Sequence, residues 1–173
     1  SVALPRWQDV VGYEEKRPEV MDRLSCGYPR FVIHPLVQEL ARQLADGRPC
    51  LPFPSLRCAE LAAEFLQRRS AQLAQIVPGH GVFGVVTDDA GLVALRAFWQ
   101  HAGLILSSRQ AKAVLEGRSA PTGGGEARRA LRRQLADLYD CAEEDVFLTP
   151  TGMAAQFAAL RAIQRRIPGA PTA

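Results

Sequence analysis

The stretch FLTPTGMAAQFAAL, residues 147–160, decides the fold class of this chain. An apolar run from Val146 meets Thr149-Pro150-Thr151-Gly152 and passes into an alanine-rich helical pattern. This order predicts a strand over 146–149, a tight turn and the start of a helix. Such a turn directs unpaired backbone N–H groups outward, with the positive end of the helix dipole behind them. The pattern predicts an anion site, although an ordinary turn capped by Thr151 has the same sequence signature.

Composition bounds the class of protein. The chain has 173 residues, which is enough for one domain with a real core, and 47% of them are hydrophobic. The net charge is +3 and the excess of arginine is scattered. A concentrated basic face is typical of nucleic-acid binding, so we expect no nucleic-acid partner. No apolar run is long enough to cross a bilayer, so we expect a cytoplasmic protein without a membrane partner.

Cysteine and lysine are sparse, which limits metal and amine chemistry. The four cysteines, none in a CxxC pair, are Cys26, Cys50, Cys58 and Cys141. We therefore expect isolated thiols and no metal site. Lys16 and Lys112 are the two lysines of the chain.

The periodicity predicts an α/β fold with helix in excess. Helices are expected over 36–44, 56–74, 91–101 and around 131–138, with a short one near 18–24, and strands over 82–87 and 146–149. PCLPFPS (49–55) reads as a rigid loop, and LILSSR (104–109) as a short strand or an extended turn. Two strands are too few for a complete sheet, and a lone buried strand leaves both backbone edges unpaired. We therefore expect an incomplete sheet that a partner chain completes.

Punctuating residues divide the chain into four segments. They are an extended N-terminal arm with a first helix (1–50), an α/β segment (51–115), a flexible glycine-rich insertion (116–127) and a helix followed by the strand-turn-helix (128–173). The three glycines of the insertion suggest a phosphate loop, but no Lys-Ser/Thr follows them and no strand precedes them. A linker is the favoured interpretation.

Four motifs in order give the chain a family resemblance. They are LPRWQDVVGYEE (4–15), GYPRFVIHPLV (27–37), FWQHAGLILSSRQA (98–111) and EDVFLTPTGMAA (144–155). The last resembles the Ser-Gly-Met-Ala-Ala segment of the Cys/Met-metabolism family of pyridoxal-phosphate (PLP) enzymes. The set is similar to the cystathionine gamma-synthase branch of fungi and some bacteria. The resemblance implies the N-terminal part of a fold-type-I PLP-dependent transferase, whereas an unrelated helical interaction domain would require four coincidental matches.

The resemblance also implies how the cofactor is held. The backbone N–H groups of Gly152 and Met153 would bind the PLP phosphate, and Thr151 stands in place of the usual serine. The family's Tyr-x-Arg element, which reaches the cofactor of a neighbouring subunit, corresponds to Ser107-Ser108-Arg109, with serine in place of the tyrosine.

Other residues offer alternatives for this clamp. Tyr28 and Arg30 form a second candidate, although they lie much earlier in the chain. An arginine suits a phosphate because its fork binds two oxygens, but a structural salt bridge is the competing interpretation for both Arg30 and Arg109.

Catalytic residues are missing from this chain. In the family, the lysine that forms a Schiff base with the cofactor, the acid beside the pyridine nitrogen and the aromatic residue on the ring all follow the Gly-Met turn. Neither Lys16 nor Lys112 matches the lysine motif, so we assign no catalytic residue. Three explanations are open: one subunit of a split enzyme, a fragment of a longer enzyme, or a catalytically silent binding or regulatory module. The closing PGAPTA, with helix-ending Pro168 and Gly169, favours a natural subunit.

The expected function follows from the split-enzyme interpretation. A C-terminal-half subunit would bring the lysine and share the PLP in a hetero-oligomer that is active only when assembled. The implied reaction is gamma-replacement on an activated homoserine ester, with a thiol such as cysteine as nucleophile. Related enzymes use carbon nucleophiles or carry out eliminations on amino-acid substrates.

Overall fold

A helix-rich α/β architecture surrounds one small sheet. The computed structural model describes residues 4, 6–24, 32–70, 74–120 and 124–167. Within these ranges the elements are, in chain order, α1 (Trp7–Glu14), α2 (Pro18–Met21), α3 (Pro35–Leu44), β1 (Cys50–Phe53), α4 (Leu56–Ser70), β2 (Gln75–Gly79), β3 (Val82–Val86), α5 (Asp89–Ala102), α6 (Ser108–Leu115), α7 (Gly125–Tyr139), the 3-10 turn η1 (Glu143–Asp145) and α8 (Gly152–Arg166).

The sheet is antiparallel, with strand order β1-β3-β2. The predicted strand over 82–87 is confirmed as β3, which lies in the centre. β2 and β3 form a hairpin closed by His80 and Gly81, whose φ angles are 42° and 86°. Two consecutive positive φ values match the right-handed twist of the flanking strands. β2 was not predicted, since no element was expected over residues 75–81.

The prolines of 49–55 suggested a rigid loop, but the segment contains the strand β1. All four residues of this strand are buried, and Phe53 is fully inaccessible. β1 lies at an edge of the sheet, where proline is tolerated because one side of the backbone needs no ladder hydrogen bond. Burial of the apolar side chains therefore outweighs the strand-breaking tendency of the three prolines in 49–55.

Helices cover both faces of the sheet. On one face, Cys50 and Val86 pack with Ala41 and Ala45 of α3 and its C-terminal turn. On the other face, Phe53 packs with α4 and α5, and its ring centroid lies 6.2 Å from that of Phe98. α6 packs alongside α3. The helices predicted over 36–44, 56–74 and 91–101 form as α3, α4 and α5, and α4 ends at Ser70 rather than near residue 74.

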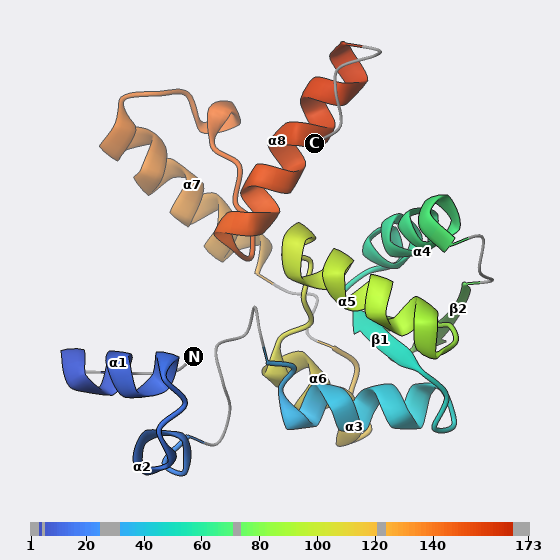
Figure 1. The fold of residues 1–173 in the computed structure, drawn as a ribbon. Helices are drawn as coiled ribbons and strands as arrows, with labels where there is room; N and C mark the ends of the chain where they lie inside the picture. The colour runs from blue at the N-terminus through green and yellow to red at the C-terminus, as the bar shows by residue number, and fades with distance from the viewer. Residues whose placement is uncertain (1–3, 5, 25–31, 71–73, 121–123, 168–173) are drawn as a thin grey trace.

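The two ends of the chain lie outside this body. α1 and α2 pack on each other, and Gly12 lies directly against Val20. α1 falls within the segment that was predicted to be mainly an extended arm. Figure 1 shows α7 and the far end of α8 projecting away from the sheet. Ala120, inside the segment expected to be flexible, is buried, and its N–H donates to the carbonyl of His80 at 2.8 Å.

The predicted strand over 146–149 does not form. These residues have no strand pairing in the part of the chain that the structure describes. Val146 keeps extended backbone angles (φ −93°, ψ 115°), so the local conformation suits a strand. A strand is defined by its neighbours, and none of the described strands lies beside this segment.

Candidate functional site

The turn that opens α8 is held by Thr151. Its backbone is extended (φ −148°, ψ 159°), and its Oγ1 accepts a hydrogen bond from the N–H of Ala154 at 3.0 Å. The same hydroxyl donates to the carbonyl oxygen of Gly103 at 3.1 Å. Thr151 is therefore the N-cap of α8 and fastens the turn to the end of α5. Its hydroxyl proton points to Gly103 in this conformation, and its predicted contact with a phosphate stays a prediction.

Two backbone donors at this turn are unoccupied. The N–H groups of Gly152 and Met153 have no hydrogen-bond partner among the described residues. Gly152 is exposed, and a Cβ placed on it would meet no atom within 4 Å. The space on the Cα side of Gly152 is therefore open. Two outward N–H groups at the positive end of a 15-residue helix can bind an oxyanion such as a phosphate ester.

Gly103 sets the position of the turn, and sequence reasoning missed it. It ends α5 in the left-handed conformation (φ 66°). A Cβ on Gly103 would lie 2.7 Å from the N atom of Ala154 and 2.7 Å from the Cβ of Met153. The two backbones thus approach more closely than any side chain allows. A glycine after a helical pattern signals a C-cap, but its contact with a turn 48 residues later is not visible in sequence.

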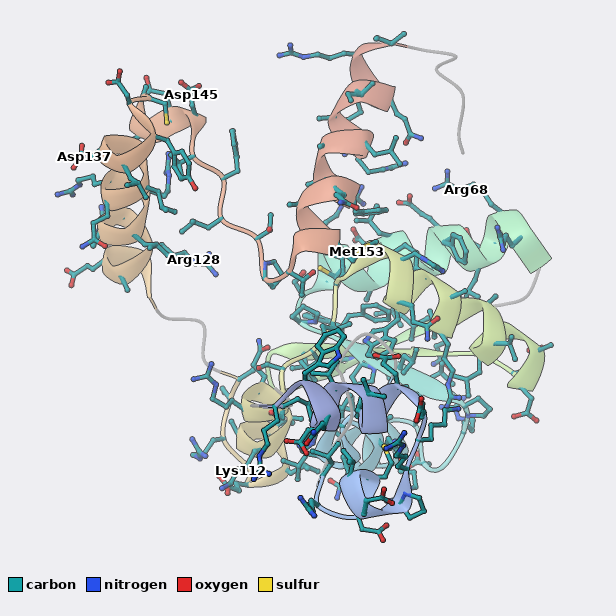
Figure 2. All side chains as sticks on the ribbon, turned by 60° about the vertical axis from the view of Figure 1, so that its left-hand side comes forward. Arg68, Lys112, Arg128, Asp137, Asp145 and Met153 are labelled. Atoms are coloured by element: carbon teal, nitrogen blue, oxygen red, sulfur yellow. The ribbon has the colours of Figure 1, made fainter. Side chains whose placement is uncertain are left out.

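An apolar groove begins at Met153 and runs between α4, α5 and α8. Its volume is about 510 Å³. Its lining residues are Phe65, Arg69, Ala97, Phe98, His101, Ala102, Met153, Gln156, Phe157 and Leu160. Phe157 contacts Phe98 edge-on at 5.9 Å between centroids, and the guanidinium of Arg69 lies 5.2 Å above the ring of Phe65. Figure 2 shows Met153 at the junction of α8 with the body.

The predicted clamp residues do not meet the turn within this chain. Ser107 caps α6 in a reciprocal hydrogen-bond pair with Gln110, and Ser108 begins that helix. Arg109 follows in its first turn and is exposed. Figure 2 shows α6, marked by Lys112, well separated from the start of α8 at Met153.

Arg109 is available to a partner. Its guanidinium makes no ion pair or hydrogen bond with any residue that the structure describes, which disfavours the structural salt bridge. Tyr28 and Arg30, the second candidate clamp, lie outside the described residues.

The two lysines lie away from the turn's chemistry. Lys112 is exposed and pairs with Glu116 at 3.8 Å. Lys16 is exposed in the turn after α1 (φ 55°). Within the described ranges, no group of three His, Cys, Asp or Glu side chains is placed to hold a metal ion. None of the described helices is long and apolar enough to cross a membrane.

Comparison with known proteins identifies homologues of this chain. The chain is 34% identical to a putative cystathionine gamma-synthase of Saccharomyces cerevisiae over 139 residues, covering 66% of this chain and 21% of the yeast protein. The cystathionine gamma-synthase of the same yeast is 31% identical, with 66% of this chain and 22% of that protein covered. The chain's homologues are cystathionine gamma-synthase and related PLP-dependent enzymes. The predicted family resemblance is thus confirmed.

A bacterial homologue matches a larger share of the chain. The L-2-amino-4-chloropent-4-enoate dechlorinase/desaturase of Streptantibioticus cattleyicolor is 34% identical, over 94% of this chain and 35% of its own length. The chain therefore spans between about a fifth and about a third of the length of these relatives. No protein-family model and no solved structure matches the chain.

Proposed function

We propose that this chain is the N-terminal subunit of a split PLP-dependent enzyme of the cystathionine gamma-synthase type, and that it supplies the turn that binds the cofactor phosphate. One observation carries the proposal: within the described residues the N–H groups of Gly152 and Met153 have no hydrogen-bond partner, and a Cβ on Gly152 would meet no atom within 4 Å. They lie in the Gly-Met segment on which the family resemblance depends. The chain spans between about a fifth and about a third of the length of the relatives it matches.

The residues present suit a phosphate monoester. Gly152 lets a phosphate approach the backbone closely, and Met153 offers the next N–H in the first turn of α8. Thr151 keeps these donors in place through its cap and its bond to Gly103. When bound, PLP supplies the electron sink that amino-acid chemistry requires. This chain's part is to hold and orient the phosphate end.

The lysine would come from a companion polypeptide. Lys112 is ion-paired on the surface and Lys16 lies in a turn beside α1, so neither is placed to reach an aldehyde held at the α8 turn. The companion would also provide the acid and the ring-stacking residue, and the PLP would be shared in a cytoplasmic hetero-oligomer. Arg109 is the residue of this chain that would reach the phosphate of a neighbouring cofactor.

The favoured reaction is gamma-replacement, with an activated homoserine ester as substrate and a thiol as nucleophile. The names of the two yeast relatives support it. A second candidate is a desaturating elimination of a leaving group from an amino acid. It is favoured by the Streptantibioticus cattleyicolor dechlorinase/desaturase, whose match covers 94% of this chain rather than 66%.

Complementation in trans tests the proposal. The companion fragment is the part of the Streptantibioticus cattleyicolor relative that this chain does not match, produced as a separate polypeptide. We expect neither polypeptide alone to retain PLP, and the mixture to retain it with its visible absorbance band. The mixture is then given an O-acyl homoserine with cysteine, or L-2-amino-4-chloropent-4-enoate, to distinguish replacement from elimination.

The control is the relative's own matched part, produced separately and mixed with the same companion fragment. If that pair retains PLP and the pair with this chain does not, the split-enzyme proposal is wrong. If this chain instead binds and modulates the intact relative without restoring the fragment, the regulatory module is the correct interpretation. The variant Gly152→Asp should abolish PLP retention because it places a carboxylate where the phosphate binds.

A further inference from the structure

The helical arm, residues 125–166, buries little of itself. Ala136 is the buried residue of the 15-residue α7, and Ala154 is the buried residue of α8. Isolated helices of this length are marginally stable in water, and tertiary packing normally supplies most of their stability. α8 is anchored at its start against α5, but α7 contacts mainly η1. These elements therefore present large unpartnered faces (Figure 1).

Exposed apolar side chains concentrate on the same arm. Among the described residues, the large exposed hydrophobics of the arm are Leu131, Leu138, Tyr139, Phe147, Leu160 and Ile163. Phe147 is the most exposed at 84%, and it lies between the two helices in sequence. Clusters of this kind mark interaction surfaces rather than ordinary solvated faces.

The segment 146–149 has the backbone of a strand without a neighbour. No N–H of 147–149 and no carbonyl of 146–149 has a hydrogen-bond partner in the described part of the chain. Val146 is extended, and the side chain of Phe147 points to solvent. A row of free donors and acceptors beside apolar side chains is a template for an added strand.

Arginines of α7 line the groove beside 146–149 and favour an acidic binding partner. A groove of about 440 Å³ is lined by Val146, Phe147 and Leu148 on one side and by Gly125, Arg128, Arg129 and Arg132 of α7 on the other. Arg132 donates to the carbonyl of Glu143 at 3.2 Å. The guanidinium groups of Arg128 and Arg129 make no ion pair or hydrogen bond within the described residues. An extended segment with carboxylate side chains complements this groove.

We propose that 146–149 and the arginine face of α7 form the docking site for an extended, acid-bearing segment of the companion polypeptide, which adds to 146–149 as a β-strand. The inference rests on the proposed function, since it names where the second subunit binds. The added strand would satisfy the free backbone groups, cover Phe147 and pair with Arg128 and Arg129. Docking would place the companion's lysine-bearing portion next to the α8 turn, because 146–149 leads directly into that turn.

Binding to the companion fragment tests the docking site. Isothermal titration is compared for the natural chain, Phe147→Asp, Arg128→Glu/Arg129→Glu and Gly152→Asp. We expect Phe147→Asp and the double arginine variant each to weaken binding about tenfold or more. Each variant places a carboxylate next to the carboxylate side chains of the docked segment. Gly152→Asp should bind the fragment normally but lose PLP. The matched controls are Val93→Asp, a substitution of another exposed apolar residue (71%), and Arg23→Glu.

Hydrogen exchange gives a second readout that does not depend on mutation. The amides of 147–149 should exchange quickly in the free chain and at least about tenfold more slowly in the complex. If the complex forms and PLP is retained but neither the variants nor the exchange of 147–149 responds, the docking site is wrong while the proposed function stands. Self-association of the chain alone through Phe147 would also overturn it, in favour of a second copy as occupant.

Discussion

At the scale of single residues, the candidate site depends on the close contact of Gly103, which has no side chain, with the turn that opens α8. Gly103 brings the end of α5 against Thr151 and Ala154, and its carbonyl accepts the Thr151 hydroxyl. The sequence motif identifies Gly152 and Met153 as candidate donors. It does not identify Gly103, because a close approach of backbones far apart in sequence has no local signature.

Gly103→Ala should therefore destabilise the protein and displace the turn. A left-handed φ strains alanine by about 1 kcal/mol, and the clash with the N atom of Ala154 adds to it, for a total of roughly 2–3 kcal/mol. Urea unfolding measures the loss. Gly117→Ala is the matched control, because Gly117 has φ 74° but open space around it, so it carries the backbone strain alone. Equal losses for the two variants would show that the contact is unimportant.

Cys50 and Cys141 should differ in reactivity because Cys50 is buried and Cys141 is exposed. Burial raises the pKa of the Cys50 thiol to about 12, against a weaker lowering by Arg48. Cys141 is exposed. In the folded protein at pH 8, an alkylating reagent should modify Cys141 and spare Cys50, because only the thiolate reacts. Mass spectrometry of peptides measures this, and rapid modification of both residues would contradict it.

The same pKa predicts a pH dependence. The unfolded chain releases the Cys50 proton near its ordinary pKa of about 9, whereas the folded protein holds it to about 12. The contribution of Cys50 to the free energy of unfolding is therefore present below pH 9 and lost as the pH rises toward 12. Cys50→Ala should flatten that decline in urea titrations between pH 8 and 11, and an unchanged slope would argue against a buried neutral thiol.

At the scale of elements, periodicity predicts the amphipathic helices and the β-branched strand, because their local preference and their burial agree. It fails where tertiary contacts decide. The segment 49–55 forms β1 because its apolar side chains bury against α4 and α5 in spite of three prolines. The segment 146–149 stays unpaired because strand formation depends on neighbours outside it. The Ser107 cap of α6 replaces the strand considered for 104–109.

Beyond the contact of Thr151 with Gly103, the packing of α8 on α5 should depend on the ring of Phe157. Phe157 contacts Phe98 at 5.9 Å, and it belongs to the α8 side of the apolar groove. Phe157→Ala should free α8, so that its amides exchange about tenfold faster while those of β3 are unchanged. Leu160→Ala is the control on the same helix, since Leu160 lines the groove but is 42% exposed. Equal acceleration of exchange in β3 would show that Phe157 supports the core as a whole.

At the scale of the whole molecule, the chain consists of a packed body and a helical arm, residues 125–166, that packs little against it. The body encloses the sheet with α3, α4 and α5, and the arm carries the turn on a helix with free faces (Figure 1). The sequence predicts an incomplete sheet, but the three strands that form are a separate antiparallel unit, and 146–149 pairs with none of them. Neither lysine of this chain, Lys16 or Lys112, lies in the family's lysine motif, which is why no catalytic lysine could be assigned from the sequence.

Magnetic resonance on the assembled complex tests the central claim most directly. This chain, labelled with ¹⁵N-glycine, is combined with the companion fragment and loaded with either PLP or pyridoxal, which lacks the phosphate. We predict that the amide resonance of Gly152 shifts strongly with PLP and little with pyridoxal, because its N–H donates to the phosphate. An identical Gly152 resonance with the two compounds, or a phosphate-dependent shift centred on another glycine, would contradict the account.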